Sequence, residues 1–325
     1  MYSFGELGEF IEKVHAEEEM SPEEQFARRA EIRAIRDLCM TGTLLCLERK
    51  NEELDALMEI SPLDLGLLRV RLSTQSSIFT MGEQYTPGHS ANATAFMAAR
   101  SLSTHGEFIR PHLTPGMKVL DCGCGPGVIS IGLAEAVGPK GHVTGIDFAE
   151  SQIAIAQACA TPNLTFQVAS VYAIPFEDNA FDLVFSHALF EHLADPIRGV
   201  REIRRVLRPG GVAGLCSPDW GGFILSPTND RVETAITRYR MLQEKNGGEP
   251  RAGRQLGSWL AAGGLVTQRM QARYECYPAS GVIAEYLAIQ LEQAGEIESG
   301  ATLREWALLP WSLFAQSWVS AVAVK

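Results

Sequence analysis

Short apolar strands and amphipathic helices alternate along the middle of this chain, and this order constrains its fold more than any other feature. The strand patterns are KVLDC, HVTGID, LTFQVAS, FDLVFS and VAGLCS, at residues 118–122, 142–147, 164–170, 181–186 and 212–217. Helical patterns separate them, in VISIGLAEAV, ESQIAIAQACA and PIRGVREIRRVLRPGG, the last of which is predicted to stop at Gly210-Gly211. Such alternation predicts an α/β domain, with a parallel sheet covered by helices on both faces.

The remainder of the chain adds helices at both ends of this pattern. Helical segments are expected near 229–246 and 251–262, followed by the strands RYECY and SWVSAVAV with two helices between them. Residues 1–60 hold fifteen acidic and seven basic side chains in helical patterns. We therefore expect an acidic helical extension over residues 1–82, serving as a lid or for dimerisation, in front of one domain over residues 83–325.

Charge and cysteine content narrow the class of protein. The net charge is −11 and no run of lysine and arginine is present, which argues against a nucleic-acid partner. No apolar run approaches a membrane span, and the acidic N-terminus lacks the pattern of a signal peptide, so a cytoplasmic protein without a membrane partner is expected. The seven cysteines show no disulfide framework. Cys122 and Cys124 are expected to be small buried thiols rather than a metal pair.

The turn after the first strand, VLDCGCGPG at 119–127, has glycine at three alternate positions. A strand, a glycine turn and a helix place a ligand at the carboxyl edge of the sheet. No lysine follows as a P-loop requires, and a dinucleotide loop would have its third glycine at Val128 instead of Gly127. Asp121 would also repel a pyrophosphate. That carboxylate suits a cationic ligand, and S-adenosylmethionine carries both an ammonium and a sulfonium.

Asp147 ends the second strand, 24 residues after Gly123. A carboxylate at this position can accept hydrogen bonds from both ribose hydroxyls, in dinucleotide and S-adenosylmethionine sites alike. Asp147 alone therefore does not separate the two ligands. Together with Asp121 and the early third glycine, it favours S-adenosylmethionine.

Four segments in order, VLDCGCGPG, HVTGIDFAESQI, VASVYAIPFEDNAFDLVFSHALFEHLADP and LRPGG, resemble class I S-adenosylmethionine-dependent methyltransferases. The resemblance covers roughly residues 85–325 and is nearest to the small-molecule branch that includes quinone-biosynthesis methyltransferases. It implies a Rossmann-like, doubly wound sheet of seven strands in the order 3-2-1-4-5-7-6, with the last strand antiparallel. The strands RYECY and SWVSAVAV would form the final hairpin.

The resemblance also implies roles for individual residues. Asp121, Gly123, Gly125 and Gly127 would line the methionine and ribose side of the cofactor. Asp147 would bind the ribose hydroxyls, and Phe148 would pack on the adenine. Ser170 and Val171 match the family's adenine contact, although Ser170 stands where the family usually has an aspartate. His187, after the fourth strand, would face the transferred methyl group.

An upstream segment, QYTPGHSANATAFMAARSLSTHGEFIRPHL at 84–113, resembles an actinobacterial and fungal subgroup of these enzymes. Tyr85, His89 and Arg100 match its pattern. Arg100 would clamp the methionine carboxylate, unless it is a solvated helix residue. Tyr85 would lie over the sulfonium, unless it only packs.

Methyl transfer needs a positioned nucleophile, and a base only where that nucleophile is poorly ionised. His187 is the best candidate base, since it ends a central strand at the ligand edge and titrates near neutral pH; otherwise it shapes the pocket wall. Asp219 follows the fifth strand in CSPDWGGF and either acts on the acceptor or builds the turn, and Trp220 beside it would wall the pocket. Glu191 and His192 are interpreted as capping and packing residues. His105 has no visible partner.

The sequence therefore predicts methyl transfer from S-adenosylmethionine to an oxygen or nitrogen atom of a small organic acceptor, a secondary metabolite. Carbon methylation of a quinone-like ring is the alternative reaction. Two rivals remain open: a catalytically silent protein that binds the cofactor and regulates, and a dinucleotide oxidoreductase.

Overall fold

The computed structural model describes residues 84–88, 91–277 and 280–325. The predicted helical extension over residues 1–82 lies outside this part of the chain, as does His89. Both therefore stay predictions. No helix among the described residues is both long and apolar enough to span a bilayer.

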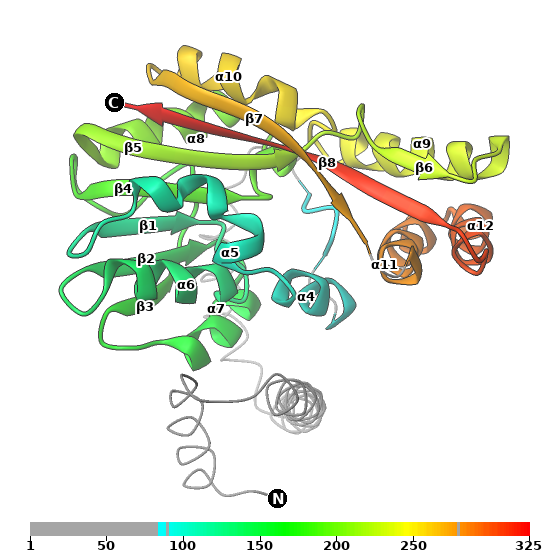
Figure 1. The fold of residues 1–325 in the computed structure, drawn as a ribbon, viewed down its shortest axis with the longest axis horizontal. Helices are drawn as coiled ribbons and strands as arrows, with labels where there is room; N and C mark the ends of the chain where they lie inside the picture. The colour runs from blue at the N-terminus through cyan, green and yellow to red at the C-terminus, as the bar shows by residue number, and fades with distance from the viewer. Residues whose placement is uncertain (1–83, 89–90, 278–279) are drawn as a thin grey trace, which may run out of the picture. The chain divides into compact units, whose positions relative to one another are not determined.

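A single mixed sheet forms the centre of the described domain (Figure 1). Its strands are β1 (Lys118–Cys122), β2 (His142–Asp147), β3 (Leu164–Val168), β4 (Phe181–His187), β5 (Leu207–Pro218), β6 (Ile224–Ser226), β7 (Val266–Cys276) and β8 (Leu313–Val324). The order is β3-β2-β1-β4-β5-β8, and the first five strands are parallel. β8 runs antiparallel to β5 and pairs with β6 and β7 as well.

The predicted α/β class is confirmed, whereas the strand count and order differ slightly from the prediction. The described chain has eight strands, because a short strand, β6, pairs with the start of β8 through Ile224 and Ala315. β7 is also longer than the predicted RYECY. Its pairing with β8 extends from Cys276–Ala315 to Val266–Val324, so β8 lies between β5 and β7.

The junction between α8 (Pro196–Val206) and β5 differs from the prediction as well. The sequence predicts that Gly210-Gly211 stops the helix, but the helix ends at Val206 and the strand begins directly at Leu207. The pairing of β5 with β4 is irregular here, since Phe181 pairs with Leu207 and Leu183 with Val212. Gly210 has a φ of +73°, which glycine adopts without strain. The two glycines therefore form an irregular part of the strand.

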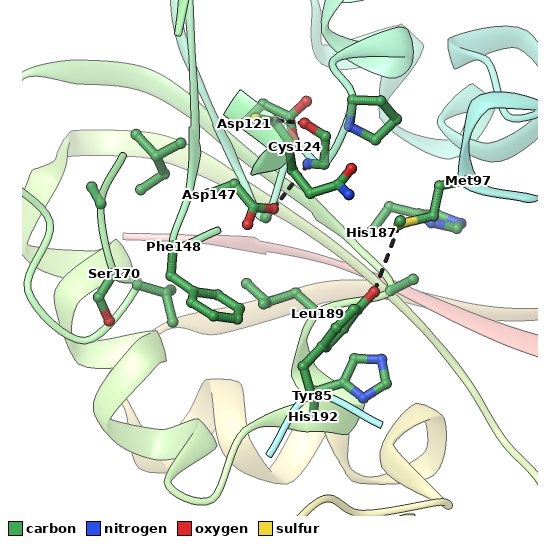
Figure 2. Close-up of a pocket in the computed structure, with 18 of the residues that line it drawn as sticks. Tyr85, Met97, Asp121, Cys124, Asp147, Phe148, Ser170, His187, Leu189 and His192 are labelled. Carbon is green, nitrogen blue, oxygen red and sulfur yellow. Dashed lines mark hydrogen bonds between the residues drawn. The ribbon is translucent and has the colours of Figure 1, made fainter. Parts of the chain in front are cut away.

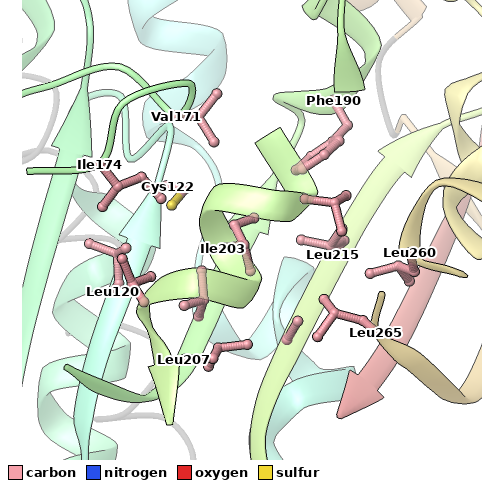
Figure 3. Close-up of a cluster of buried hydrophobic side chains, with 14 of the residues drawn as sticks. Leu120, Cys122, Val171, Ile174, Phe190, Ile203, Leu207, Leu215, Leu260 and Leu265 are labelled. Carbon is pink, nitrogen blue, oxygen red and sulfur yellow. The ribbon is translucent and has the colours of Figure 1, made fainter. Parts of the chain in front are cut away.

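The helices cover both faces of the sheet. Their bounds are α4 (Ala91–Ala98), α5 (Leu102–His105), η3 (Glu107–His112), α6 (Val128–Val137), α7 (Glu150–Ala156), η4 (Gln157–Cys159), η5 (Phe190–His192), α9 (Asp230–Lys245), α10 (Ala252–Ala262), α11 (Ser280–Gln293) and α12 (Ile297–Ala307). α6 and α7 pack in one apolar cluster, and α8 and α10 pack in another with the opposite sides of β1 and β5. Figure 3 shows this second cluster, in which Leu120, Ile203 and Leu260 come from β1, α8 and α10.

A third apolar cluster joins α9, α11 and α12 to the beginning of β8. Tyr286, Trp306 and Phe314 are buried in it, whereas Trp311 is 81% exposed. Figure 1 shows α4 and α11 beyond the carboxyl ends of the parallel strands. These helices thus border the edge of the sheet at which the sequence places a ligand.

Candidate active site

A cavity of about 390 Å³ opens at the carboxyl ends of β1, β2 and β4. It contains ten of the predicted cofactor residues: Tyr85, Arg100, Asp121, Gly123, Gly125, Asp147, Phe148, Ser170, Val171 and His187. Parallel strands bring their carboxyl ends to one edge, which explains why residues so far apart in the chain meet here. Figure 2 shows Phe148 and Ser170 at one end of the cavity, His187 and Met97 at the other, and Asp147 between them.

The glycine loop wraps one side of the cavity and is tied to β2. The backbone N–H groups of Gly123 and Cys124 both donate to the Ile146 carbonyl, at 2.8 and 3.0 Å. Gly123 and Gly125 have φ values of +72° and +52°, a region that side chains disfavour. Leu189 packs over Gly123, where a Cβ would lie only 3.1 Å from the leucine Cβ. The loop therefore needs glycine both for its turn and for the approach of its neighbour.

Gly127 lies at the same loop but does not line the cavity, contrary to its predicted cofactor role. It caps the N-terminus of α6 with a φ of +82°. A Cβ at Gly127 would lie 2.7 Å from the ring of Phe166, and a Cβ at Gly145 would lie 2.5 Å from the same ring. Gly127 is thus required by the packing of Phe166, a residue of β3, between the loop and β2.

Asp121 is a buried carboxyl on β1, 2% exposed. The Ser130 hydroxyl donates to its Oδ2 at 2.6 Å. Burial raises the pKa of Asp121 to about 7; the Ser130 hydrogen bond works against this shift and the charge of Asp147 adds to it. A cationic ligand beside Asp121 would favour its ionised form. The position thus fits the ammonium or sulfonium of S-adenosylmethionine.

Asp147 connects the glycine loop to the start of α7. Its Oδ2 accepts the Gly125 N–H at 3.0 Å (Figure 2), and its Oδ1 accepts the Ala149 N–H at 2.9 Å. Each carboxylate oxygen can accept a further hydrogen bond, so two ribose hydroxyls can still be held. Phe148, the next residue, is 37% exposed and lines the cavity, as an adenine platform requires.

Ser170 turns the chain at the other end of the cavity. Its hydroxyl accepts the Tyr172 N–H at 3.2 Å, and its backbone pairs with Ala173 in an isolated bridge. The hydroxyl proton can still be donated, or a lone pair used, toward a ligand. Val171 is buried and contributes to both the cavity wall and the apolar cluster beneath it. An uncharged, flat purine suits these surroundings.

His187 ends β4 and is 5% exposed. Neither ring nitrogen has a hydrogen-bond partner in the described structure. The ring stacks on Trp318 with centroids 4.6 Å apart, and His105 meets it edge to face at 5.1 Å. Burial lowers the pKa of His187 well below 6.5, and the charges of Arg100, His105 and Arg273 lower it further. His187 is therefore a neutral imidazole with unused hydrogen-bonding capacity in the cavity wall.

Arg100 and Tyr85 border the same end. The Arg100 guanidinium lies 5.8 Å from the ring centroid of Phe96 and 5.7 Å from that of Trp318. No carboxylate of the described residues lies within ion-pair distance of it, so an anionic ligand group would complete its surroundings. The Tyr85 hydroxyl donates to the Met97 sulfur at 3.6 Å, and its ring meets His192 edge to face at 4.7 Å. Tyr85 is thus fixed by packing in the cavity wall.

Asp219 and Trp220 lie away from the cavity. Both oxygens of Asp219 pair with Arg254 of α10, at 2.7 and 2.8 Å, and its Oδ1 also accepts the Gly221 N–H. Burial would raise the pKa of Asp219, but these contacts outweigh it and lower the pKa. Trp220 is buried against Tyr239 and Phe314. The structure gives Asp219 a turn-forming role and Trp220 a core role.

Sequence reasoning missed several wall residues, among them Met97, Gln152 and Leu189. Gln152 is buried and donates to Thr94 at 3.1 Å, which ties α7 to α4. Leu189 follows Ala188, whose positive φ of 56° turns the chain after β4. In a sequence, such apolar or amide side chains look like ordinary core residues. No sequence pattern therefore predicts that they line the cavity. Glu191, interpreted as a capping and packing residue, is buried and accepts the Ser217 hydroxyl at 2.9 Å.

Comparison with known proteins identifies the domain. Residues 113–257 match the family model for a methyltransferase domain. A demethylmenaquinone methyltransferase of Staphylococcus aureus is 38% identical over 99 residues, 30% of this chain and 41% of that protein. An uncharacterized methyltransferase of Schizosaccharomyces pombe is 27% identical over 185 residues, 54% of this chain and 66% of that protein. The chain spans only 37% to 66% of the lengths of these and another curated relative.

The fold agrees with this match. A solved structure from Bacillus halodurans, described as a methyltransferase candidate, superposes with a TM-score of 0.50 at 16% identity. The match covers 68% of this chain and 97% of that one. The family match, the sheet and the cavity with its two carboxyls agree. Residues 113–257 therefore carry a methyltransferase domain.

Proposed function

We propose that this protein transfers the methyl group of S-adenosylmethionine to an oxygen or nitrogen atom of a small organic acceptor, a secondary metabolite. One observation carries the proposal. The cavity holds two carboxyls, Asp121 and Asp147, where a cationic nucleoside would lie, and a neutral imidazole without a partner, His187, toward its other end.

The donor would be held along the whole cavity. Asp147 would accept the ribose hydroxyls while its other lone pairs keep Gly125 and Ala149 in place. Phe148, Ser170 and Val171 would enclose the adenine at the far end. Asp121 would balance the positive charge of the donor. The carboxylate of Asp121 would attract the sulfonium and ammonium of this donor, whereas it would repel the pyrophosphate of a dinucleotide.

Two residues would fix the methionine end. Arg100, which has no carboxylate partner in the described structure, would clamp the methionine carboxylate through its planar guanidinium. Tyr85 would present its ring to the sulfonium, with the hydroxyl directed toward Met97. The methyl group would then point toward His187.

The transfer is an in-line displacement on carbon. The nucleophile of the acceptor forms a bond to the methyl carbon while the carbon–sulfur bond breaks, and its electron pair moves to sulfur. Where the nucleophile carries a proton, neutral His187 would take it, because its ring nitrogens are otherwise unused. S-adenosylhomocysteine and the methylated acceptor are the products.

Two measurements test the proposal. Calorimetric titrations with S-adenosylhomocysteine and with NAD should show binding of the first and none of the second; the reverse result would overturn it. Incubation of the protein and S-adenosylmethionine with a library of hydroxylated and amine-bearing metabolites should then yield a product heavier by one methylene. Binding without turnover on any acceptor would instead support a catalytically silent, regulatory protein.

Carbon methylation of a quinone-like ring is a second candidate reaction, and the Staphylococcus aureus relative named above favours it. Product analysis by NMR separates the two reactions, because a methyl on oxygen or nitrogen and a methyl on a ring carbon have different chemical shifts. We also propose that residues 1–82 form a lid or a dimerisation element. Sedimentation of the full chain over a range of concentrations would reveal the dimer.

A further inference from the structure

A second cavity of about 320 Å³ lies between the α5–η3 segment and β7. Its wall is formed by Thr104, His105, Glu107, Phe108, Pro111, Arg269, Gln271 and Arg273. His105 lines this cavity, and His187, whose ring it contacts at 5.1 Å, lines the first. Two imidazoles in contact therefore stand between the second cavity and the end of the first where the methyl group is transferred.

The β7 wall of this second cavity is basic. Residues 269, 271 and 273 alternate along the strand, so their side chains leave the same face of the sheet. Within the part of the chain that the structure describes, neither Arg269 nor Arg273 has a carboxylate within 4.0 Å. The Nη2 atom of Arg273 is buried and donates no hydrogen bond. A buried donor of this kind is costly unless a ligand or water accepts from it.

Two carboxylates near this wall, those of Glu107 and Glu275, each contact a residue other than Arg269 and Arg273. Glu107 pairs with Arg110 at 2.9 Å. Glu275 accepts from His105 Nε2 at 3.1 Å through one oxygen, while its other oxygen is buried without a partner. Glu275 therefore adds negative charge behind His105, but it does not form an ion pair with Arg273. The guanidinium groups keep their capacity to bind an anion from outside.

We propose that this second cavity is a binding site for a phosphate- or carboxylate-bearing small molecule, held by Arg273 and Arg269 with the Gln271 amide as a neutral donor. Guanidinium groups match the planar, paired oxygens of such anions. In the wall of this cavity, Arg269 is exposed to solvent and His105 is buried. The bound anion would be either the acidic substituent of the acceptor or a separate metabolite that is sensed through the His105–His187 contact.

The probe for the test is inorganic phosphate, titrated calorimetrically into the full-length protein at constant ionic strength maintained with sodium chloride. The wild type should bind it, and Arg273→Gln together with Arg269→Gln should weaken binding by at least about tenfold, the loss expected for charged hydrogen bonds. A variant with Arg273→Lys and Arg269→Gln should bind phosphate more tightly than the double glutamine variant, because lysine keeps the positive charge. Arg251→Gln, an arginine outside this cavity, is the matched control and should bind as the wild type does.

The absence of phosphate binding by the wild type would overturn the proposal, and so would equal affinity in the double variant. Retained binding of S-adenosylhomocysteine by the double variant shows that it is folded. Calorimetry with phosphate requires no methyl transfer, so this test and that of the proposed function fail separately. Once an acceptor is turned over, phosphate that competes with it identifies the anion as part of the acceptor. Phosphate that changes the rate without competing identifies a separate anion.

Discussion

At the scale of single residues, Asp147 combines a structural role in the glycine loop with a position in the cavity wall, and its place in the sequence does not reveal the first of these. It holds the backbone of Gly125 and Ala149 by hydrogen bonds, and it faces the cavity where a ribose would lie. A change at this residue would thus remove the proposed ribose contacts and would also leave the N–H groups of Gly125 and Ala149 without their acceptor.

We expect Asp147→Ala to weaken the binding of S-adenosylhomocysteine by about 1–3 kcal/mol, because hydrogen bonds to a charged group are lost. Isothermal calorimetry measures this difference. Asp147→Asn is the matched variant, since one amide oxygen still accepts a backbone N–H, and it should lose less. Unchanged affinity in the alanine variant would remove Asp147 from the site.

Asp121 should make cofactor binding depend on pH. The pKa of this carboxyl is raised, mainly by burial, to about 7 in the protein without ligand, and a cationic ligand requires its ionised form. Binding should therefore tighten by about tenfold between pH 6 and pH 8, with release of a proton at the lower pH. Calorimetry in buffers of different ionisation enthalpy detects that proton. Asp121→Asn should bind weakly and without this pH dependence.

The raised pKa of Asp121 affects the stability of the fold in the direction opposite to its effect on ligand binding. Because the folded pKa of Asp121 lies above the unfolded value of 3.8, the folded state holds the proton more firmly between these two pH values. The contribution of Asp121 to the stability of the ligand-free protein thus declines as the pH rises from about 4 to about 7. As the pH rises toward 7, ionisation of Asp121 therefore strengthens ligand binding but lowers the stability of the ligand-free fold.

His187 is the residue whose substitution tests the chemistry. If it takes the proton of the acceptor, His187→Ala should reduce the rate by about 10²–10⁴. Burial lowers the pKa of His187 well below 6.5, so its neutral form prevails throughout the neutral range, and protonation of His187 should produce no loss of rate from pH 8 down to 6.5. Product assays on reactions quenched at set times measure the rate of the variant and the dependence of the wild-type rate on pH. A variant with nearly normal turnover would leave His187 only a wall residue.

At the scale of elements, the link between Asp219 and Arg254 joins the end of β5 to α10. Asp219 is buried and accepts hydrogen bonds from two backbone N–H groups, of Gly221 and Arg254, besides those of the guanidinium. The turn after β5 depends on these contacts. An acidic residue at the carboxyl edge of a sheet can thus be structural.

Asp219→Ala should lower the free energy of unfolding by about 1–3 kcal/mol, because two backbone donors and the guanidinium lose their acceptor. Urea unfolding measures this change. Turnover per folded molecule should stay as in the wild type, because Asp219 lies outside the cavity. A loss of turnover with no change in the free energy of unfolding would instead indicate a catalytic role for Asp219.

The elements that the sequence predicts best are those with local signals. KVLDC, VISIGLAEAV and HVTGID form β1, α6 and β2 with the predicted bounds, since period and flanking glycines determine them. The sequence does not predict β6 and the first half of β7, because their pairing with β8 joins residues about 50–90 positions apart. The end of α8 was misplaced because Gly210-Gly211 serves an irregular strand instead of a helix stop.

At the scale of the whole molecule, the topology brings the site together, and it is the part that the sequence predicts most fully. Asp147 and His187 end parallel strands, and Asp121 is the next-to-last residue of another, so the strand order alone places them at one edge. The walls supplied by Met97 and Leu189 depend on the packing of α4 and of the turn after β4. The His105–Glu275 pair joins residues 170 positions apart, and no sequence pattern connects them.

The ring of Phe166 lies against two glycine positions, one in the loop and one in β2. Residues 127 and 166 should therefore show epistasis. Gly127→Ala alone would suffer both from its positive φ, about 1–2 kcal/mol, and from a clash with the ring. Phe166→Leu, which shortens the side chain, should relieve the clash and leave the backbone cost. Evolution can thus exchange the third glycine of the loop only after a smaller residue has appeared two strands away.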